Sequence, residues 1–223
     1  MTRIDAVLFD WGDTLFESPH APSVILEAAR TRGVPMDDDA AERMWTDIWA
    51  ASKTVEEHAK GRDLSPDAHR RVWLDLFARA TARIPGIDRV LYDQVMEPSS
   101  WRPYVDAEPI LRALRQRGEK IGIVSNHPYD LRPFFLAHGL AGYVDAYVFS
   151  GEVGAAKPSP AMFIEACRVL GVAPQHTLMV GDDAVSDGGA AAVGLQLYLL
   201  PPYAHGSARG LDEVVRLVDR SRA

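Results

Sequence analysis

Two patterns of hydrophobic spacing divide the chain. From about residue 104 onward, short apolar runs alternate with stretches in which apolar residues recur at helical spacing. A first apolar run, residues 4–9, predicts one more strand near the start. Because strands that alternate with helices build parallel sheets, we predict an α/β fold with a doubly wound parallel sheet. The expected strands are 121–125, 146–149, 178–180 and 196–200, and the expected helices are 107–117, 131–138, 161–170, 188–193 and 211–220.

Residues 21–96 have a helical pattern throughout. Ser65-Pro66 is a good helix start, with proline in the first turn. Further helices are expected at 24–29 and 87–95. The aromatic residues fall on single helical stripes, which favours a helix-bundle core over a cofactor-binding surface. The two longest stripes are Met44, Trp45, Ile48, Trp49, Ser52 and Val55, and Val72, Trp73, Leu76, Phe77 and Ala80.

The helical region therefore interrupts an α/β domain after its first strand. Proline-rich segments at 18–22 and 98–103 flank it. We predict a core made of residues 1–17 and 101–223, and an inserted α-helical domain of residues 18–100.

Composition narrows the function classes. The chain has 223 residues, 47% of them hydrophobic, and a formal net charge of −7 without a basic cluster, so nucleic-acid binding has no electrostatic support. The single cysteine, Cys167, lies on an apolar helix face and permits no internal disulfide. No signal-peptide pattern is visible, and no apolar run approaches the about 20 residues of a membrane span, so we expect a cytoplasmic protein without membrane contact.

Side chains that can act in catalysis or bind a ligand lie where the predicted strands end. Asp10 follows the first apolar run, and Ser125-Asn126 ends the run 121–125. Lys157 precedes the helix 161–170. Since ligands of open α/β sheets bind at the carboxyl ends of the strands, we expect these groups to meet. A pair of acids completes the set after the run 178–180, as Gly181-Asp182-Asp183, with Asp187 shortly after.

In order and spacing, these motifs resemble those of the haloacid dehalogenase-like hydrolase superfamily, over nearly the whole chain. The resemblance implies a Rossmann-like core with a helical cap that closes over the site and selects the substrate. It also implies a Mg²⁺-dependent hydrolase, most simply a phosphatase of a small phosphorylated metabolite. We expect a monomer or a homodimer.

The resemblance assigns roles to individual residues. Asp10 is the nucleophile that forms an aspartyl-phosphate. Ser125, Asn126 and Lys157 bind the phosphoryl oxygens, and Lys157 offsets negative charge. Mg²⁺ takes few protein carboxylates; its expected ligands are Asp10, Asp182 and the backbone carbonyl of Gly12. Behind these ligands we expect Asp187, which orients Lys157 or a metal-bound water, and Asp183, which is a supporting residue or a loop cap.

Gly12 departs from the family pattern. Family phosphatases have an aspartate there that protonates the leaving oxygen and activates water, a contribution of about 10²–10⁴-fold. Four explanations remain open. Asp13 swings into this role; a cap residue replaces it; the substrate has a good leaving group; or the protein turns over poorly and acts as a metal-containing binding protein. The candidate cap residues are His20, Lys53 and His58.

Two other reactions remain as alternatives. A dehalogenase-like enzyme would carry tyrosine at the Gly12 position, and the Asp182/Asp187 pair favours a metal instead. A phosphonatase-like enzyme would need a Schiff-base lysine, and Lys53 and Lys60 are the lysines of the helical region. His127 and His20 stand near the motifs and are further candidates to line the site.

Overall fold

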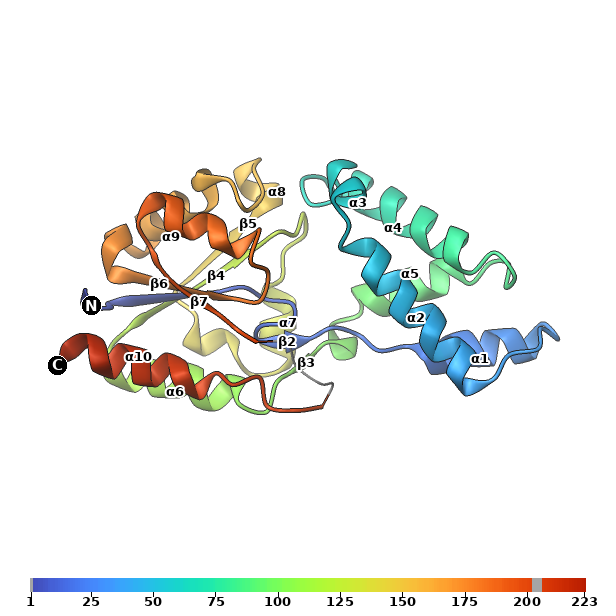
Figure 1. The fold of residues 1–223 in the computed structure, drawn as a ribbon, viewed down its shortest axis with the longest axis horizontal. Helices are drawn as coiled ribbons and strands as arrows, with labels where there is room; N and C mark the ends of the chain where they lie inside the picture. Colours follow the sequence, from blue (N-terminus) through green and yellow to red (C-terminus); the bar gives the residue numbers. More distant parts are fainter. Residues whose placement is uncertain (1, 202–205) are drawn as a thin grey trace. The chain divides into compact units, whose positions relative to one another are not determined.

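The structure, a computed structural model, describes residues 2–201 and 206–223. The chain divides into two compact units (Figure 1). One unit contains Met1–Ser18 and Arg102–Ala223, and the other contains Pro19–Trp101. None of the helices within the described ranges is long and apolar enough to span a membrane.

The first unit contains a five-stranded parallel sheet in the order β5-β4-β1-β6-β7. Phe9, the last residue of β1, pairs with Ile123 in β4 and with Val180 in β6, so these three strands end within two residues of the same register position. This confirms the doubly wound parallel sheet. The strands are β1 (Ala6–Phe9), β4 (Lys120–Ser125), β5 (Ala146–Phe149), β6 (Thr177–Gly181) and β7 (Gln196–Leu199).

Helices cover both faces of this sheet. Figure 1 shows α6 (Ala107–Arg117) and α10 (Asp212–Arg222) on one face and α9 (Pro160–Leu170) on the other. On the α9 side, buried Leu8, Val124, Phe163 and Met179 share one apolar cluster. Their burial fixes the strand ends in space. The remaining helices of this unit are α7 (Arg132–Ala137), α8 (Ser150–Val153) and the 3₁₀ helices η2 (Ala141–Tyr143), η3 (Pro174–His176) and η4 (Asp187–Val193).

A short two-stranded sheet joins the two points where the chain leaves and re-enters the first unit. Phe16 of β2 (Phe16–Glu17) pairs with Pro103 of β3 (Arg102–Pro103) in antiparallel fashion. Two-residue strands lack a hydrophobic period, so this pair could not be predicted from the spacing of apolar residues.

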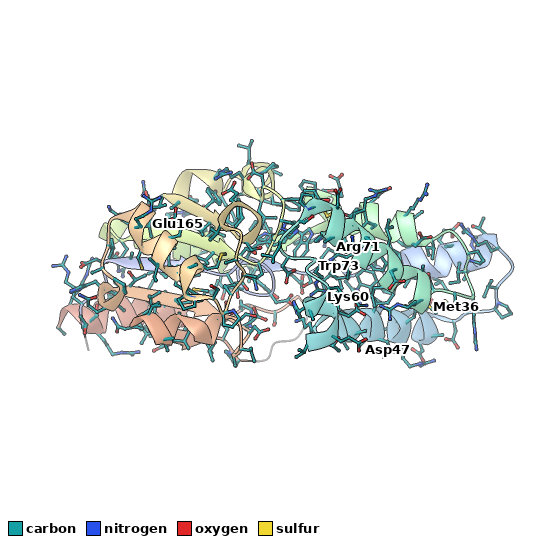
Figure 2. All side chains as sticks on the ribbon, turned by 90° about the horizontal axis from the view of Figure 1, so that it is seen from above. Met36, Asp47, Lys60, Arg71, Trp73 and Glu165 are labelled. Atoms are coloured by element: carbon teal, nitrogen blue, oxygen red, sulfur yellow. The ribbon has the colours of Figure 1, made fainter. Side chains whose placement is uncertain are left out.

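The second unit is entirely helical. A row of aromatic rings runs through it: Trp45–Trp49, Trp49–Trp73 and Trp73–Phe77 have ring centroids 5.4–5.5 Å apart. Trp73, labelled in Figure 2, is 8% exposed. The row confirms that these aromatics form a bundle core. The helices are α1 (Pro22–Thr31), α2 (Asp38–Ser52), α3 (Val55–Ala59), α4 (Pro66–Ala80), α5 (Asp88–Met96) and the 3₁₀ helix η1 (Pro98–Ser100).

One expectation about these elements was wrong. Val55 does not continue the α2 stripe, because α2 ends at Ser52 and the Thr54 side chain accepts a hydrogen bond from the Glu57 amide to start α3. Val55 is 86% exposed in this new helix. The expected helix at 188–193 is present as the 3₁₀ helix η4.

Candidate active site

Asp10 is held at the carboxyl end of β1 by backbone and side-chain contacts. Its amide donates a hydrogen bond to the Val180 carbonyl of β6 at 3.0 Å. Its Oδ1 accepts a hydrogen bond from the Trp11 amide at 2.7 Å and lies 2.9 Å from Lys157 Nζ. Both contacts reach the same oxygen, so they fix the direction of Oδ2.

Lys157 lies between two carboxylates. Its Nζ is 2.9 Å from Asp10 Oδ1 and 2.7 Å from Asp187 Oδ1, and its side chain is 1% exposed. Lys157 is therefore a buried cation of this site and not a solvated loop charge. The geometry brings the predicted nucleophile and the predicted cation into direct contact.

Asn126 secures the backbone of this lysine. The Lys157 amide donates to Asn126 Oδ1 at 2.6 Å, and Asn126 Nδ2 donates to the Lys157 carbonyl at 3.0 Å. The Asn126 side chain thus ties the loop after β4 to the Lys157 segment. Ser125, at the end of β4, is 5% exposed.

Three acidic side chains form one group at this edge. Oxygens of Asp10, Asp182 and Asp187 all lie within 4.8 Å of one another. The Thr14 hydroxyl donates to Asp182 Oδ1 at 3.1 Å. Asp187, expected behind the metal ligands, is in the same group as they are. Its Oδ2 accepts from the Asp183 amide at 3.0 Å.

The Asp183 side chain hydrogen-bonds within its own loop. Its Oδ1 accepts hydrogen bonds from the amides of Val185 and Ser186 at 2.8 and 3.0 Å. The Asp183 side chain is therefore a loop cap in this structure, one of the two roles left open for it.

Burial and neighbouring charges shift the pKa values in this cluster. The pKa of Asp10 is raised to about 7, chiefly by burial; Lys157 opposes this rise, and Asp187 and Asp182 contribute to it. Burial lowers the pKa of Lys157, but the carboxylates of Asp10 and Asp187 outweigh it and hold that pKa above its usual range. Lys157 therefore stays charged, yet one ammonium does not neutralise three carboxylates. A hard divalent cation with oxygen ligands fits this donor set.

The Asp13 carboxylate is hydrogen-bonded to Ser18. Its backbone has a φ of +54°, and Asp13 Oδ1 accepts from the Ser18 amide at 3.3 Å and from the Ser18 hydroxyl. Arg209 Nε donates to its carbonyl at 2.6 Å. The Asp13 carboxylate is thus used to hold the turn between β1 and β2, at a residue only 6% exposed.

Two contributors were not predicted. Gly181 permits the approach of Asp187, because a Cβ on Gly181 would meet Asp187 Oδ2 at 2.0 Å. Thr14 positions Asp182. Thr14 stood inside the first motif, so its hydroxyl was a usable signal, whereas the need for glycine at 181 depends on packing that only the structure contains.

The comparisons with known proteins agree with this geometry. The sequence matches the family described as haloacid dehalogenase-like hydrolase over residues 4–194. Haloacid dehalogenase-like hydrolase domain-containing protein 3 of Mus musculus is 30% identical over 196 residues, which cover 84% of this chain and 76% of the mouse protein. Ribulose-1,5-bisphosphate 5-phosphatase of Halopiger xanaduensis is 28% identical over 206 residues, covering 88% and 84%.

Solved structures show the same fold. YfnB from Bacillus subtilis, a HAD-hydrolase solved with magnesium bound, superposes with a TM-score of 0.76 at 18% identity and covers 98% of this chain and 100% of its own. Solved L-2-haloacid dehalogenases also share the fold. Because the family match spans most of the chain and the relatives include named phosphatases, this protein belongs to the haloacid dehalogenase-like hydrolases.

Proposed function

We propose that the chain is a Mg²⁺-dependent phosphatase that passes the phosphoryl group of a small phosphorylated metabolite to Asp10 and then to water. The observation that carries this proposal is the Asp10 carboxylate, held through Oδ1 by Trp11 and Lys157. A fixed carboxylate beside a buried cation is suited to in-line attack on phosphorus.

The reaction has two steps. A carboxylate oxygen of Asp10 attacks phosphorus, and the bond from phosphorus to the leaving oxygen breaks. The leaving oxygen departs with a proton unless it is already a stable anion. Water then attacks phosphorus and loses a proton, which releases inorganic phosphate and restores Asp10. Lys157 offsets charge throughout, and the Ser125 hydroxyl is the proposed donor to a phosphoryl oxygen.

Asp10, Asp182 and the Gly12 carbonyl are the proposed ligands of Mg²⁺, with Asp187 as a further carboxylate in the group. When bound, the cation would offset the charge of these carboxylates and of the phosphate dianion. The raised pKa of Asp10 supports a cation here, since burial disfavours the charged carboxylate, Asp187 and Asp182 add to this effect, and Lys157 does not offset both.

The proposed substrate class comes from the relatives. Ribulose-1,5-bisphosphate 5-phosphatase, phosphoserine phosphatase and glyceraldehyde 3-phosphate phosphatase are names of similar proteins, and each indicates a small phosphorylated compound.

The alternative reactions have less support. A phosphonatase-like mechanism needs a free nucleophilic lysine, but Lys60 (labelled in Figure 2) is ion-paired with the buried carboxylate of Glu57 at 2.6 Å. A dehalogenase-like mechanism does not require three clustered carboxylates. A weakly catalytic binding protein remains the alternative that Gly12 favours.

A release assay separates these functions. We expect phosphate release from a panel of phosphomonoesters with Mg²⁺, abolished by EDTA and by Asp10→Asn, and no halide release from 2-haloacids. Halide release without added metal would favour a dehalogenase. Metal binding without any turnover would favour the binding protein.

A further inference from the structure

We propose that His127 performs the proton transfers that Gly12 cannot perform, as a catalytic acid–base residue on the loop after β4. This inference rests on the proposed phosphatase function and names a residue that acts in it. The leaving oxygen must gain a proton in the first step, and water must lose one in the second.

The side chains already described at this edge are committed to other contacts. Gly12 has no side chain, and the Asp13 carboxylate is bonded to Ser18. Lys157 lies between Asp10 and Asp187, where its raised pKa makes it a poor proton donor. Asp183 caps its own loop. A group that exchanges protons near neutral pH is still required, and an imidazole has that property.

His127 stands next to the nucleophile's loop. It follows Ser125 by two residues, and its ring centroid is 5.5 Å from that of Trp11 in an edge-on contact. The Trp11 amide is itself the donor to Asp10 Oδ1. Because β1 and β4 are neighbouring parallel strands, the loops after them rise side by side at the edge where Asp10 lies.

The loop that carries His127 is firmly positioned. The Gly151 amide of α8 donates to the His127 carbonyl at 3.4 Å. A Cβ on Gly151 would meet Pro128 Cα at 2.7 Å, so the backbone after His127 packs directly on α8. Asn126, on the other side, is tied to Lys157. A well-supported backbone on both sides keeps the position of the His127 side chain defined.

The Tyr129 backbone orients the imidazole. Nδ1 lies 3.3 Å from the Tyr129 amide nitrogen and 3.4 Å from the Tyr129 carbonyl. In the Nδ1-protonated ring that the proposed reaction uses, Nδ1–H donates to this carbonyl, and Nε2 is the nitrogen that exchanges protons.

This arrangement balances the protons of both steps. The imidazolium gives its Nε2 proton to the leaving oxygen as the bond to phosphorus breaks, and Nδ1–H remains bonded to the Tyr129 carbonyl. Nε2 then accepts a proton from the water that attacks the aspartyl-phosphate. One turnover restores the imidazolium.

The test compares His127→Gln with wild type on two leaving groups. The substrates are 4-nitrophenyl phosphate, whose leaving group needs no proton, and the alkyl phosphate that the wild-type protein hydrolyses fastest. Rapid-quench measurements give the rate of the first step for each. The matched control is His176→Gln, a partly exposed histidine before β6 whose Nδ1 lies 2.9 Å from the Arg3 carbonyl.

We expect His127→Gln to slow the first step on the alkyl phosphate by about 10²-fold or more and to change it on 4-nitrophenyl phosphate by less than about threefold. A retained nitrophenol burst would show that the variant is folded and that Asp10 still reacts. Adding Gly12→Asp to His127→Gln should restore the alkyl-to-aryl ratio, because it places a carboxylic acid at the vacant position.

Several results would overturn the proposal. Equal losses on both substrates would make His127 a purely structural residue. An unchanged alkyl-to-aryl ratio, or a wild-type protein that hydrolyses only aryl phosphates, would show that no proton passes through it. Wild-type protein that releases no phosphate from either substrate would instead defeat the proposed phosphatase function.

Discussion

At the scale of single residues, Lys157 joins the chemistry to the stability of the site. It is the cation that both Asp10 and Asp187 contact, and its side chain is almost completely buried. Removing one member of a buried group of charges leaves the remaining charges uncompensated and poorly solvated. Stability and catalysis should therefore fail together.

We predict that Lys157→Met lowers the free energy of unfolding of the metal-free protein by about 3–5 kcal/mol and abolishes phosphate release. Chemical denaturation in EDTA measures the first effect. The matched control is Lys120→Met, at the start of β4, whose Nζ donates to the Leu170 carbonyl; it should cost about 1 kcal/mol. Similar losses in the two variants would contradict the role given to Lys157.

A second residue-scale prediction concerns the adjacent acids Asp182 and Asp183. Asp182 belongs to the carboxylate group, whereas Asp183 caps a loop. Asp182→Ala should raise the Mg²⁺ concentration for half-maximal activity by at least about tenfold, a loss that even supporting residues of metal sites can cause. Asp183→Ala should raise it less. Titration of activity with Mg²⁺ decides, and the reverse order would remove Asp182 from the ligand set.

At the scale of elements, the period of hydrophobic residues predicted most strands and helices. The elements that it did not predict have physical causes. The expected helix 107–117 and the expected strand 146–149 have the same bounds as α6 and β5, because amphipathic and buried runs mark them clearly. The α2–α3 break depends on a local cap at Thr54, which leaves no periodic signal.

Most residues of the candidate site end a strand or follow one, which is how the sequence pattern indicated them, whereas Lys157 precedes α9. Their contacts could not be predicted: the engagement of Asp13 by Ser18, and of Asn126 by the Lys157 backbone, depends on loop paths. Asp13 also adopts a left-handed backbone conformation, which sequence period does not reveal.

The turn from β6 to η4 offers a test at this scale. Gly181→Ala would drive a methyl group into Asp187, while Gly188, in η4, has open space around the position of a Cβ. We predict that Gly181→Ala lowers both phosphate release and the free energy of unfolding, the latter by about 1–3 kcal/mol. Gly188→Ala should leave both nearly unchanged. Equal behaviour of the two variants would mean that Asp187 is not fixed by this contact.

At the scale of the whole molecule, the chain has two separate cores. One lies against the parallel sheet, and the other is the aromatic row of the helical unit. The sequence predicted an insertion after the first strand, at residues 18–100, and the structure divides the chain after Ser18 and before Arg102. Damage to one core should leave the local chemistry of the other unit in place.

Trp73→Ala should destabilise the helical unit by about 3–5 kcal/mol, since it removes a large buried ring. Mg²⁺ affinity, measured by isothermal titration calorimetry, should stay close to wild type because its proposed ligands belong to the sheet unit. The control is Val55→Ala, at a residue 86% exposed, with an expected change within about 0.5 kcal/mol. Loss of Mg²⁺ binding in Trp73→Ala would contradict the independence of the two cores.

The most direct test of the central claim is chemical identification of the phosphorylated residue. Wild-type protein is mixed with substrate and Mg²⁺, quenched during the first turnover, reduced with borohydride and digested for mass spectrometry. We predict homoserine at position 10, the reduction product of an aspartyl-phosphate, and none in samples quenched without substrate. Phosphate release at the normal rate with position 10 always recovered as unmodified aspartate would contradict Asp10 as the nucleophile.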